Sequence, residues 1–115
     1  MALHPREAAS DGRIGEVFKA LADPTRRRVL ELLRRGPLTA GALSEHFEFS
    51  KPTMSAHFAV LKEAGLVEAV RDGKTILYHL KLSVLEDALL GFAGVFGMVA
   101  GTAKATARKQ KGATR

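Results

Sequence analysis

The sequence contains no cysteine and no long hydrophobic run. Without cysteine, the chain cannot form disulfides, carry out thiol redox chemistry or bind metals through thiolates. No stretch stays apolar over the roughly 18 residues that a membrane-spanning helix needs. The N-terminal segment MALHPREAASDGR is too polar for the apolar core of a signal peptide. These absences predict a chain without a membrane span, and the lack of cysteine fits a cytoplasmic location.

Acidic residues are missing from one end of the chain. The last 14 residues, TAKATARKQKGATR, carry five basic residues and no acidic one. The whole chain of 115 residues has 18 basic and 12 acidic residues, so the part before this tail is nearly balanced, at 13 against 12. The net charge of +6 suggests a polyanionic partner. We expect one domain over residues 13–101, between a flexible N-terminus at 1–12 and a basic, disordered tail at 102–115.

Hydrophobic spacing and helix-start residues predict two helices in the first third of the chain. An apolar stripe at the spacing i, i+3, i+4, i+7 indicates a short first helix and consists of Ile14, Val17, Phe18 and Leu21. Asp23 and Pro24 are typical of the N-cap and first turn of a second helix. This helix should run to about Arg35, where Gly36 and Pro37 stop it.

Two further helices, separated by a short connection, follow. Thr39 can cap a third helix that carries Leu43 and Phe47. After a tight connection at residues 48–49, Ser50 can cap a fourth helix, which Gly65 ends. This pair has the arrangement of a helix-turn-helix motif.

The remaining sequence predicts a hairpin and a last helix. The runs LVEAVR and KTILYHL are β-prone, and the Asp72-Gly73 pair between them is a strong signal for a two-residue hairpin turn. A last helix should begin near Ser83 and run to about Ala100. The resulting order, α-α-α-α-β-β-α, is mainly α with a small β-hairpin. It predicts a winged helix-turn-helix domain.

The helix predicted at residues 50–64 has an unusual exposed face. Met54, Phe58 and Leu61 mark its inner side, whereas the other side offers short side chains and hydroxyls with almost no Glu or Lys. A helix that enters the DNA major groove brings its backbone close to the base edges, so long charged side chains would obstruct it. Alternatively, Ser50 and Thr53 only cap the helix, and the small residues pack on another helix. The preceding short helix and the following hairpin favour DNA.

The candidate DNA-binding residues are on this face and at the hairpin tip: Ser50, Lys51, Pro52, Thr53, Ser55, Ala56, His57, Arg71 and Lys74. His57 lies at the edge of the inner side, where a hydrogen-bonded structural role is favoured over a base contact. Arg71 and Lys74 flank the turn, where a wing meets DNA; the alternative is protection of an edge strand by charge. The three arginines at 26–28 could bind phosphate. Successive helical residues point about 100° apart, however, so salt bridges or solvation explain them equally well.

The last predicted helix combines large hydrophobic residues with glycines, which recur as Gly91, Gly94, Gly97 and Gly101. A glycine costs about 1 kcal/mol relative to alanine inside a helix, so four need a reason, and close helix–helix approach supplies one. We expect the first and last helices to pair across a two-fold axis. The expected dimer interface is Ile14, Val17, Phe18, Leu21, Leu85, Leu89, Phe92 and Phe96. A membrane-surface helix is the rival hypothesis, but the basic polar face of such a helix is lacking.

Four segments together resemble the ArsR family of bacterial winged-helix repressors: VFKALADPTRRRVLELL, LTAGALSEHF, SKPTMSAHFAVLKEAGLV and RDGKTILYHL. The resemblance covers about three fifths of the chain, and SKPTMSAHF and LEDALLGF are most similar to the autorepressor branch of the family. It implies a homodimer that represses transcription, binds double-stranded DNA at an inverted repeat and releases it on some signal.

The chain differs from the metal-sensing members of the ArsR family at the positions that hold the metal. The positions that match their cysteine motif are Thr39, Ala40 and Gly41, which offer no thiolate and no imidazole. Glu86 and Asp87 near the start of the last helix lack histidine partners, because no histidine follows His79. We therefore expect no metal response and no cofactor.

Enzymatic activity is not expected either, because no carboxylate pair, nucleophile–base arrangement or phosphate loop is found. Two classes of function then compete. One is a sequence-specific DNA-binding regulator, and the other is a protein that uses the same scaffold to bind a protein partner or a membrane. An architectural DNA binder without sequence preference lies between them.

Overall fold

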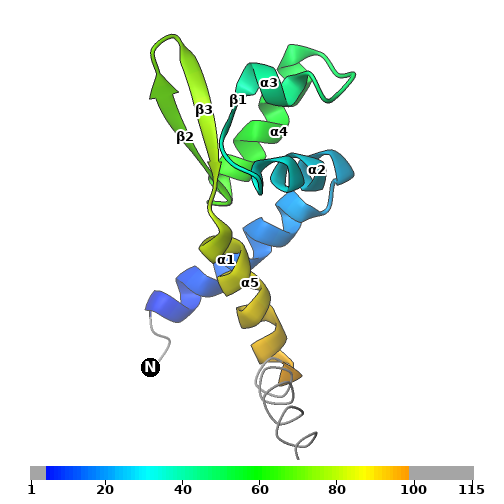
Figure 1. Ribbon diagram of the computed structural model, residues 1–115. Helices are drawn as coiled ribbons and strands as arrows, with labels where there is room; N and C mark the ends of the chain where they lie inside the picture. Colours follow the sequence, from blue (N-terminus) through cyan, green and yellow to red (C-terminus); the bar gives the residue numbers. More distant parts are fainter. Residues whose placement is uncertain (1–4, 99–115) are drawn as a thin grey trace, which may run out of the picture.

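The computed structural model describes residues 5–98, and within them it contains five helices and a three-stranded antiparallel sheet (Figure 1). The elements follow the predicted order, with one additional short strand. In chain order they are α1 (Pro5–Leu21), α2 (Pro24–Leu33), β1 (Leu38–Thr39), α3 (Ala40–Ser44), α4 (Lys51–Glu63), β2 (Val67–Asp72), β3 (Thr75–Leu80) and α5 (Leu82–Val95).

Three predicted helix starts are held by side-chain caps. Asp23 Oδ2 accepts hydrogen bonds from the backbone N–H groups of Thr25 (2.8 Å) and Arg26 (3.2 Å) at the start of α2. Thr39 Oγ1 accepts one from the N–H of Ala42 (3.0 Å) at the start of α3, and Ser50 caps α4 in the same way. Because these side chains satisfy N–H groups that have no partner within the helix, the capping residues fix where each helix begins.

The hydrophobic core lies where α1, α2, α3 and α4 meet the base of the sheet. Its largest fully buried side chains are Val17, Val29, Leu43, Met54, Leu61 and Leu66. Partly buried residues, Phe47 and Tyr78 among them, pack around this cluster. Helix α3 ends at Ser44, so Phe47 reaches the core from the connection that follows it and not from the helix, as the sequence had suggested.

The sheet has one strand more than predicted, in the order β1-β3-β2. β1 pairs antiparallel with β3, with Leu38 opposite Tyr78 and Thr39 opposite Leu77. A strand of two residues is too short to show an alternating pattern in the sequence. Its effect is to attach the start of α3 to the middle of β3.

The hairpin turn is shifted by one residue from the predicted Asp72-Gly73 pair. Asp72 is the partner of Thr75 across the hairpin, so the two loop residues are Gly73 and Lys74. Gly73 has φ +65°, whereas Lys74 has no positive φ, a pattern that fits a type II′ turn with glycine at its first central position. The Thr75 hydroxyl also donates to the carbonyl of Asp72 (2.8 Å).

Gly65 ends α4 in the left-handed conformation, with φ +78°. A Cβ atom at this position would overlap the guanidinium of Arg13 from α1 and lie 3.7 Å from Cγ1 of Val84 in α5. Glycine is favoured here by its backbone conformation, since the Arg13 guanidinium is the end of a flexible side chain that could move and the distance to Val84 is an ordinary contact.

The two outer helices have boundaries that differ from the predictions. Helix α1 begins at Pro5, so the first helix starts well before the stripe that begins at Ile14 and extends into the N-terminal segment expected to be flexible. The segment PREAAS has good helix formers and a proline suited to the first turn. Helix α5 ends at Val95 and not near Ala100, and Gly97 follows it with φ +72°. Val99, Gly101 and the basic tail at 102–115 lie outside the described residues.

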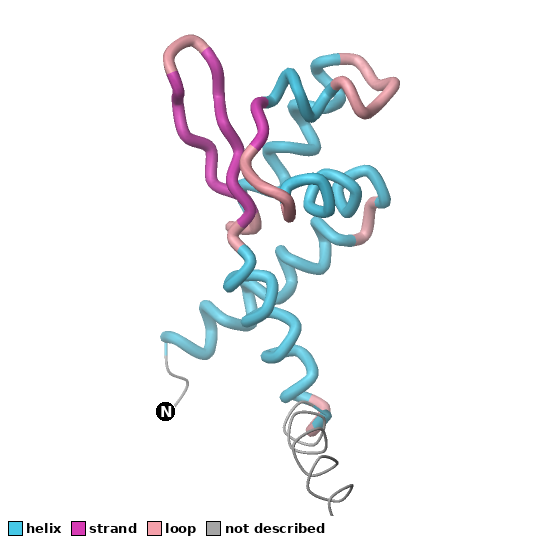
Figure 2. The backbone as a smooth tube through the Cα atoms, in the orientation of Figure 1, coloured by secondary structure: helices cyan, strands magenta, loops and turns pink. Residues whose placement is uncertain are grey.

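Helices α1 and α5 pack against each other below the rest of the molecule, at the end opposite the hairpin tip (Figures 1 and 2). The rings of Phe18 and Phe92 are 4.7 Å apart between centroids. A Cβ at Gly91 would lie 3.2 Å from Cδ1 of Ile14, so the glycine permits this close approach. No helix among the described residues has the length and hydropathy needed to cross a membrane.

We predict that Asp23→Ala lowers the free energy of unfolding by about 1 kcal/mol, because two N–H groups at the start of α2 lose their acceptor. Asp23→Asn should cost much less at neutral pH, since asparagine caps equally well. Urea unfolding followed by circular dichroism measures both. Equal losses for the two variants would contradict the capping role.

The stability of wild type and of Asp23→Asn should depend differently on pH, and the sign of the difference follows from the pKa of Asp23. Burial raises the pKa of Asp23, but hydrogen bonds from the N–H groups of Arg26 and Thr25 outweigh it and leave the pKa below its ordinary value of 3.8. Stability from the ionised carboxylate is fully present above that value and is lost as the pH falls through the lower, folded pKa. Between roughly pH 5 and pH 2, wild type should therefore lose more stability than Asp23→Asn.

Candidate nucleic-acid interface

Helix α4 separates its apolar and polar residues between two sides. Met54, Phe58 and Leu61 are buried in the core, as the spacing predicted. The exposed residues before Glu63 include no acid; they are Lys51, Pro52, Thr53, Ser55, Ala56, Ala59 and Lys62. Between Lys51 and Lys62 this surface of α4 consists of short side chains and carries no carboxylate of its own, although Glu45 after α3 lines the same hollow as Lys51 and Ser55.

The N-terminal end of α4 uses the hydroxyls of Ser50 and Thr53 for capping. Ser50 Oγ accepts from the N–H of Thr53 (3.2 Å) and donates to Thr53 Oγ1 (3.0 Å). Both residues nevertheless remain exposed. Ser50 therefore caps α4, as one of the two interpretations of the sequence expects, and both side chains remain accessible to a ligand. Pro52 has no N–H group, and the N–H groups of Thr53 and Met54 both donate to Ser50, so the attraction of this helix end for a phosphate rests mainly on the helix dipole.

His57 is turned toward α2 and away from the exposed face of α4. Its Nδ1 lies 3.1 Å from Nη1 of Arg26 and 4.0 Å from Oδ2 of Asp23. Arginine can only donate, so in this arrangement Nδ1 accepts and the ring proton is on Nε2. The side chain is only 16% exposed. The structure therefore favours the structural role, in which His57 joins α4 to α2, and a contact of His57 with DNA stays a prediction.

The hairpin of β2 and β3 forms the second part of the candidate interface. Its tip lies at the same end of the molecule as α3, far from α1 and α5 (Figure 1). Arg71 and Lys74 are exposed near the tip, in β2 and in the turn. Asp72 between them offsets one of the two positive charges. The hairpin thus presents flexible cations at the end of a narrow projection, as a wing does.

Phe49 is a feature that the sequence analysis missed, because it was assigned only to a tight connection. The structure places it between α3 and α4, directly before Ser50, with 50% of its surface exposed. It lines a hollow of about 550 Å³ together with Lys51 and Ser55 of α4 and with residues of α3. A large aromatic residue in a turn next to a helix cap was the signal that could have found it.

The three arginines at 26–28 do not form a phosphate-binding cluster. Arg26 donates to the carbonyls of Ala20 (2.7 Å) and Lys19 (3.0 Å), and Arg27 donates to that of Leu21 (2.7 Å). These carbonyls belong to the last turn of α1, where helical N–H partners run out, although the carbonyl of Lys19 also accepts from the N–H of Ala22 (3.2 Å). Two arginines of α2 therefore cap the C-terminus of α1.

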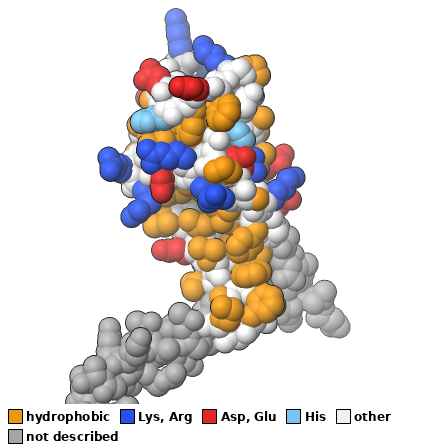
Figure 3. Space-filling model, turned by 90° about the vertical axis from the view of Figure 1, so that its right-hand side faces the viewer, with side chains coloured by type: hydrophobic (Ala, Val, Ile, Leu, Met, Phe, Trp, Pro, Cys, Tyr) orange, Lys and Arg blue, Asp and Glu red, His pale blue; other side chains and the backbone are white. Residues whose placement is uncertain are grey.

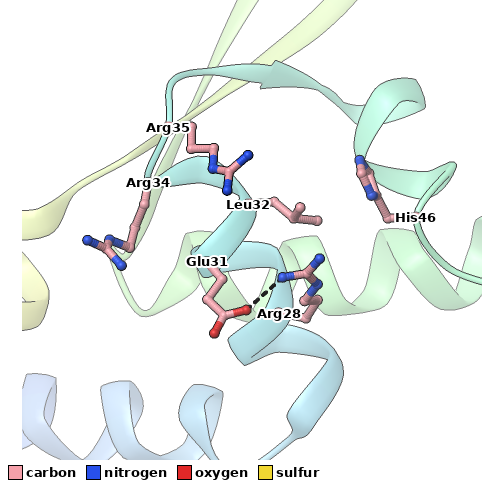
Figure 4. A pocket seen from close by; sticks show the side chains of 6 residues that line it. All are labelled: Arg28, Glu31, Leu32, Arg34, Arg35 and His46. Atoms are coloured by element: carbon pink, nitrogen blue, oxygen red, sulfur yellow. Dashed lines mark hydrogen bonds and ion pairs between the residues drawn. The ribbon is translucent and has the colours of Figure 1, made fainter.

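Arg28 points to a different side of α2, where it pairs with Glu31 (2.8 Å). This pair borders a second hollow of about 630 Å³, which is also lined by Leu32, Arg34, Arg35 and His46 (Figure 4). The guanidinium groups of Arg34 and Arg35 point away from each other in the close view (Figure 4). Arg34 and Arg35 lie at the C-terminal end of α2, where positive charge interacts favourably with the helix dipole. This interaction explains the basic residues around the hollow without a bound ligand.

A match to a protein-family model agrees with this geometry. The model described as "Bacterial regulatory protein, arsR family" matches residues 23–69, which run from the cap of α2 into β2. The transcriptional repressor SdpR of Bacillus subtilis is 46% identical over 76 residues, which are 66% of this chain and 84% of that protein. The chain belongs to the ArsR family.

Other similar proteins agree with this assignment. An arsenical resistance operon repressor of Staphylococcus aureus is 38% identical over 66% of this chain and 73% of its own length. The structure of an ArsR-like transcriptional regulator from Rhodococcus sp. RHA1 matches with a TM-score of 0.69 and 27% identity, over 89% of this chain and 94% of that one. The homodimeric winged helix-turn-helix domain of a possible ArsR-family regulator from Mycobacterium bovis matches with a TM-score of 0.65 and 32% identity, over 82% and 90%.

The ArsR assignment confirms two of the predictions made from the sequence. The fold is a winged helix-turn-helix. The family consists of regulatory proteins and not enzymes, as expected. The positions that match the cysteine motif of metal-sensing ArsR proteins, Thr39 to Gly41, form the start of α3, and the Thr39 hydroxyl is engaged in the cap. Among the described residues, no group of three or more histidine, aspartate or glutamate side chains could hold a metal.

A broad apolar surface lies over α5 (Figure 3). Its large hydrophobic residues are exposed by between 43% and 69%; they are Leu89, Leu90, Phe92, Val95, Phe96 and Met98. Such a surface is unusual on a monomer and is typical of an interface. Val17 is an exception in the expected dimer set. It is fully buried inside the protomer and has no surface to offer a second copy, so its assignment is corrected.

We predict that Arg26→Ala destabilises the protein by about 2 kcal/mol, because two carbonyls of α1 and Nδ1 of His57 lose their donor. Arg28→Ala is the matched control. It removes only an exposed i,i+3 ion pair and should change stability by no more than about 0.5 kcal/mol. Denaturant unfolding of both variants measures the difference. Similar values for the two would show that the bonds to α1 contribute little.

Proposed function

We propose that the chain is a homodimeric transcriptional repressor that binds an inverted-repeat operator, with α4 in the major groove and the hairpin as the wing. One observation carries the proposal: the exposed face of α4 is free of carboxylates and stands at the same end of an ArsR fold as the basic hairpin tip. Repression is supported by the similarity to SdpR and to the arsenical resistance repressor, both of which are named as repressors.

Different parts of α4 have different tasks in this proposal. Lys51, Ser55 and Ala56 face outward near the start of the helix, where residues of a recognition helix contact base edges. Ser50, Pro52 and Thr53 form the capped N-terminus, which approaches a backbone phosphate. His57 keeps α4 in place through Arg26.

The wing and the tail add affinity more than selectivity. Arg71 and Lys74 contact the backbone or the minor groove beside the site read by α4. The basic segment at 102–115 adds phosphate contacts without reading sequence. Such contacts give a salt-dependent affinity, with a log–log slope of about 0.9 per phosphate neutralised.

Dimerisation is proposed to use the apolar surface of α1 and α5. The residues involved are Ile14, Phe18, Leu21, Leu85, Leu89, Phe92 and Phe96. A second copy related by a two-fold axis would cover the exposed part of this surface, since the same patch then serves both subunits. The similarity to a homodimeric winged helix-turn-helix domain from Mycobacterium bovis supports a homodimer. The two-fold axis in turn requires a two-fold operator.

The signal that releases the DNA is proposed to be something other than a metal bound through cysteines. Relatives named for arsenical and mercury resistance match this chain over part of its length. Here no cysteine exists in the sequence, so a thiolate site cannot form. No cofactor is required for the proposed binding to DNA.

We predict that Phe96→Glu converts the dimer into a monomer without unfolding it, because this side chain is 63% exposed in one protomer and would meet a second copy. Phe92→Glu should disrupt the dimer too, but it also removes the contact of Phe92 with Phe18 inside the protomer. Analytical ultracentrifugation at micromolar concentration measures the association.

Ser83→Glu is the control for added charge, because Ser83 is exposed at the start of α5, outside the proposed interface. This variant should remain dimeric. A wild-type protein that sediments as a well-folded monomer would contradict the proposed dimer. It would favour the alternative in which the apolar surface binds another protein.

We predict that replacing both Lys51 and Ser55 with alanine reduces the preference for operator over random DNA, because each good base contact contributes roughly 1–3 kcal/mol of discrimination. The operator is first selected from random DNA, and gel shifts then compare it with scrambled sequence. Deleting the residues after Thr102 should instead weaken both kinds of binding alike and flatten the salt dependence.

The two variants distinguish recognition of the base sequence from general affinity for DNA. Full discrimination in the helix variant, together with its loss on deletion of the tail, would assign reading to the tail and overturn the role of α4. Wild-type protein that prefers no sequence would overturn the proposal as a whole.

A further inference from the structure

Phe49 has an exposure that the packing of the protein does not explain. Half of its surface is open, although it is one of the larger hydrophobic residues. The other large hydrophobic residues with high exposure among the described residues lie on α5, just after it, or at Val70 of the hairpin. Phe49 alone lies at the connection that leads into α4.

The ring is held on one side and open on the other. Its centroid lies 6.3 Å from that of His57 in an edge-on arrangement, and His57 is itself fixed by Arg26. Phe49 also borders the hollow that Lys51 and Ser55 line. The exposed half of an anchored aromatic side chain therefore adjoins two residues that are proposed to face the bases.

We infer that Phe49 contacts the 5-methyl group of a thymine in the major groove and thereby selects a T·A pair in each half of the operator. The inference rests on the proposed function, because it requires α4 to enter the groove. The thymine methyl is the apolar group that base pairs present in the major groove, and phenylalanine is one of the side chains suited to it. A residue directly before the cap of a recognition helix lies near the base edges that the first turn contacts.

A purely structural role is the competing explanation. Phe49 occupies the position before the N-cap, where a hydrophobic residue can fix the entry of the chain into the helix. In that case its removal would weaken the fold and binding to every DNA sequence, but would not change which base is preferred. Removal of a single methyl group from the DNA separates the two explanations without changing the protein.

The experiment replaces each thymine of the selected operator, one position at a time, by deoxyuridine, which lacks the 5-methyl group. Wild-type protein should lose affinity about three- to fivefold at one thymine in each half-site, the factor expected for one buried methyl group. Phe49→Ala should bind the unmodified operator more weakly and should no longer distinguish thymine from deoxyuridine at that position.

Two further variants control for folding. Phe49→Leu keeps an apolar side chain and should retain part of the sensitivity to deoxyuridine. Leu82→Ala removes another exposed hydrophobic side chain, at the start of α5 and outside the proposed dimer surface, and should leave the profile unchanged. Circular dichroism and thermal unfolding check that each variant is folded.

Each result decides between the explanations. A Phe49→Ala variant that keeps the wild-type deoxyuridine profile would overturn the inference, as would a wild-type profile with no sensitive thymine. In both cases the selected operator would still be bound specifically, so the proposed function would stand. Loss of all sequence preference in wild-type protein would instead overturn the proposed function.

Discussion

Burial of one side of α4 is the constraint on which the rest of the structure depends. Met54, Phe58 and Leu61 are almost completely removed from solvent. Because their positions fix the rotation of the helix about its own axis, they also decide that Lys51, Ser55 and Ala56 face outward. A core this small leaves a narrow margin of stability, so polar contacts at the ends and sides of α4 also matter for its orientation. Ser50 sets its start, and His57 holds its flank against α2.

The helices below α4 are joined to this arrangement through charged side chains as well as through the core. Arg26 and Arg27 bind the last carbonyls of α1, and Arg26 also reaches His57. An arginine fork can serve several acceptors at once, which a lysine could not do in the same geometry. One residue of α2 thus links the helix proposed for dimerisation to the helix proposed for reading DNA.

Much of the fold could be predicted from the sequence, because capping residues and apolar spacing are local signals. The starts of α2, α3 and α4 follow from Asp23, Thr39 and Ser50, and the hairpin was found within one residue. Strand β1 was missed, since it exists only through its pairing with β3. The site was predicted less completely. Spacing placed His57 at the edge of the buried side but could not show its bond to Arg26, and it could not distinguish Val17, inside the core, from Phe18 beside it. Such distinctions depend on which neighbours a side chain meets, and these come from distant parts of the chain.

The meeting of three helices at Gly65 has a consequence for the geometry of a dimer. Arg13 of α1 and Val84 of α5 both approach the point where α4 ends, and no side chain separates them from its backbone. A change in the positions of α1 and α5 would therefore be felt where α4 ends. A small rotation of these two helices, from whatever source, would tilt α4 and displace its far end, which carries Lys51, by a larger distance. The distance between the two α4 helices of a dimer would then depend on the contacts at Gly65, a position outside the proposed DNA-binding surface.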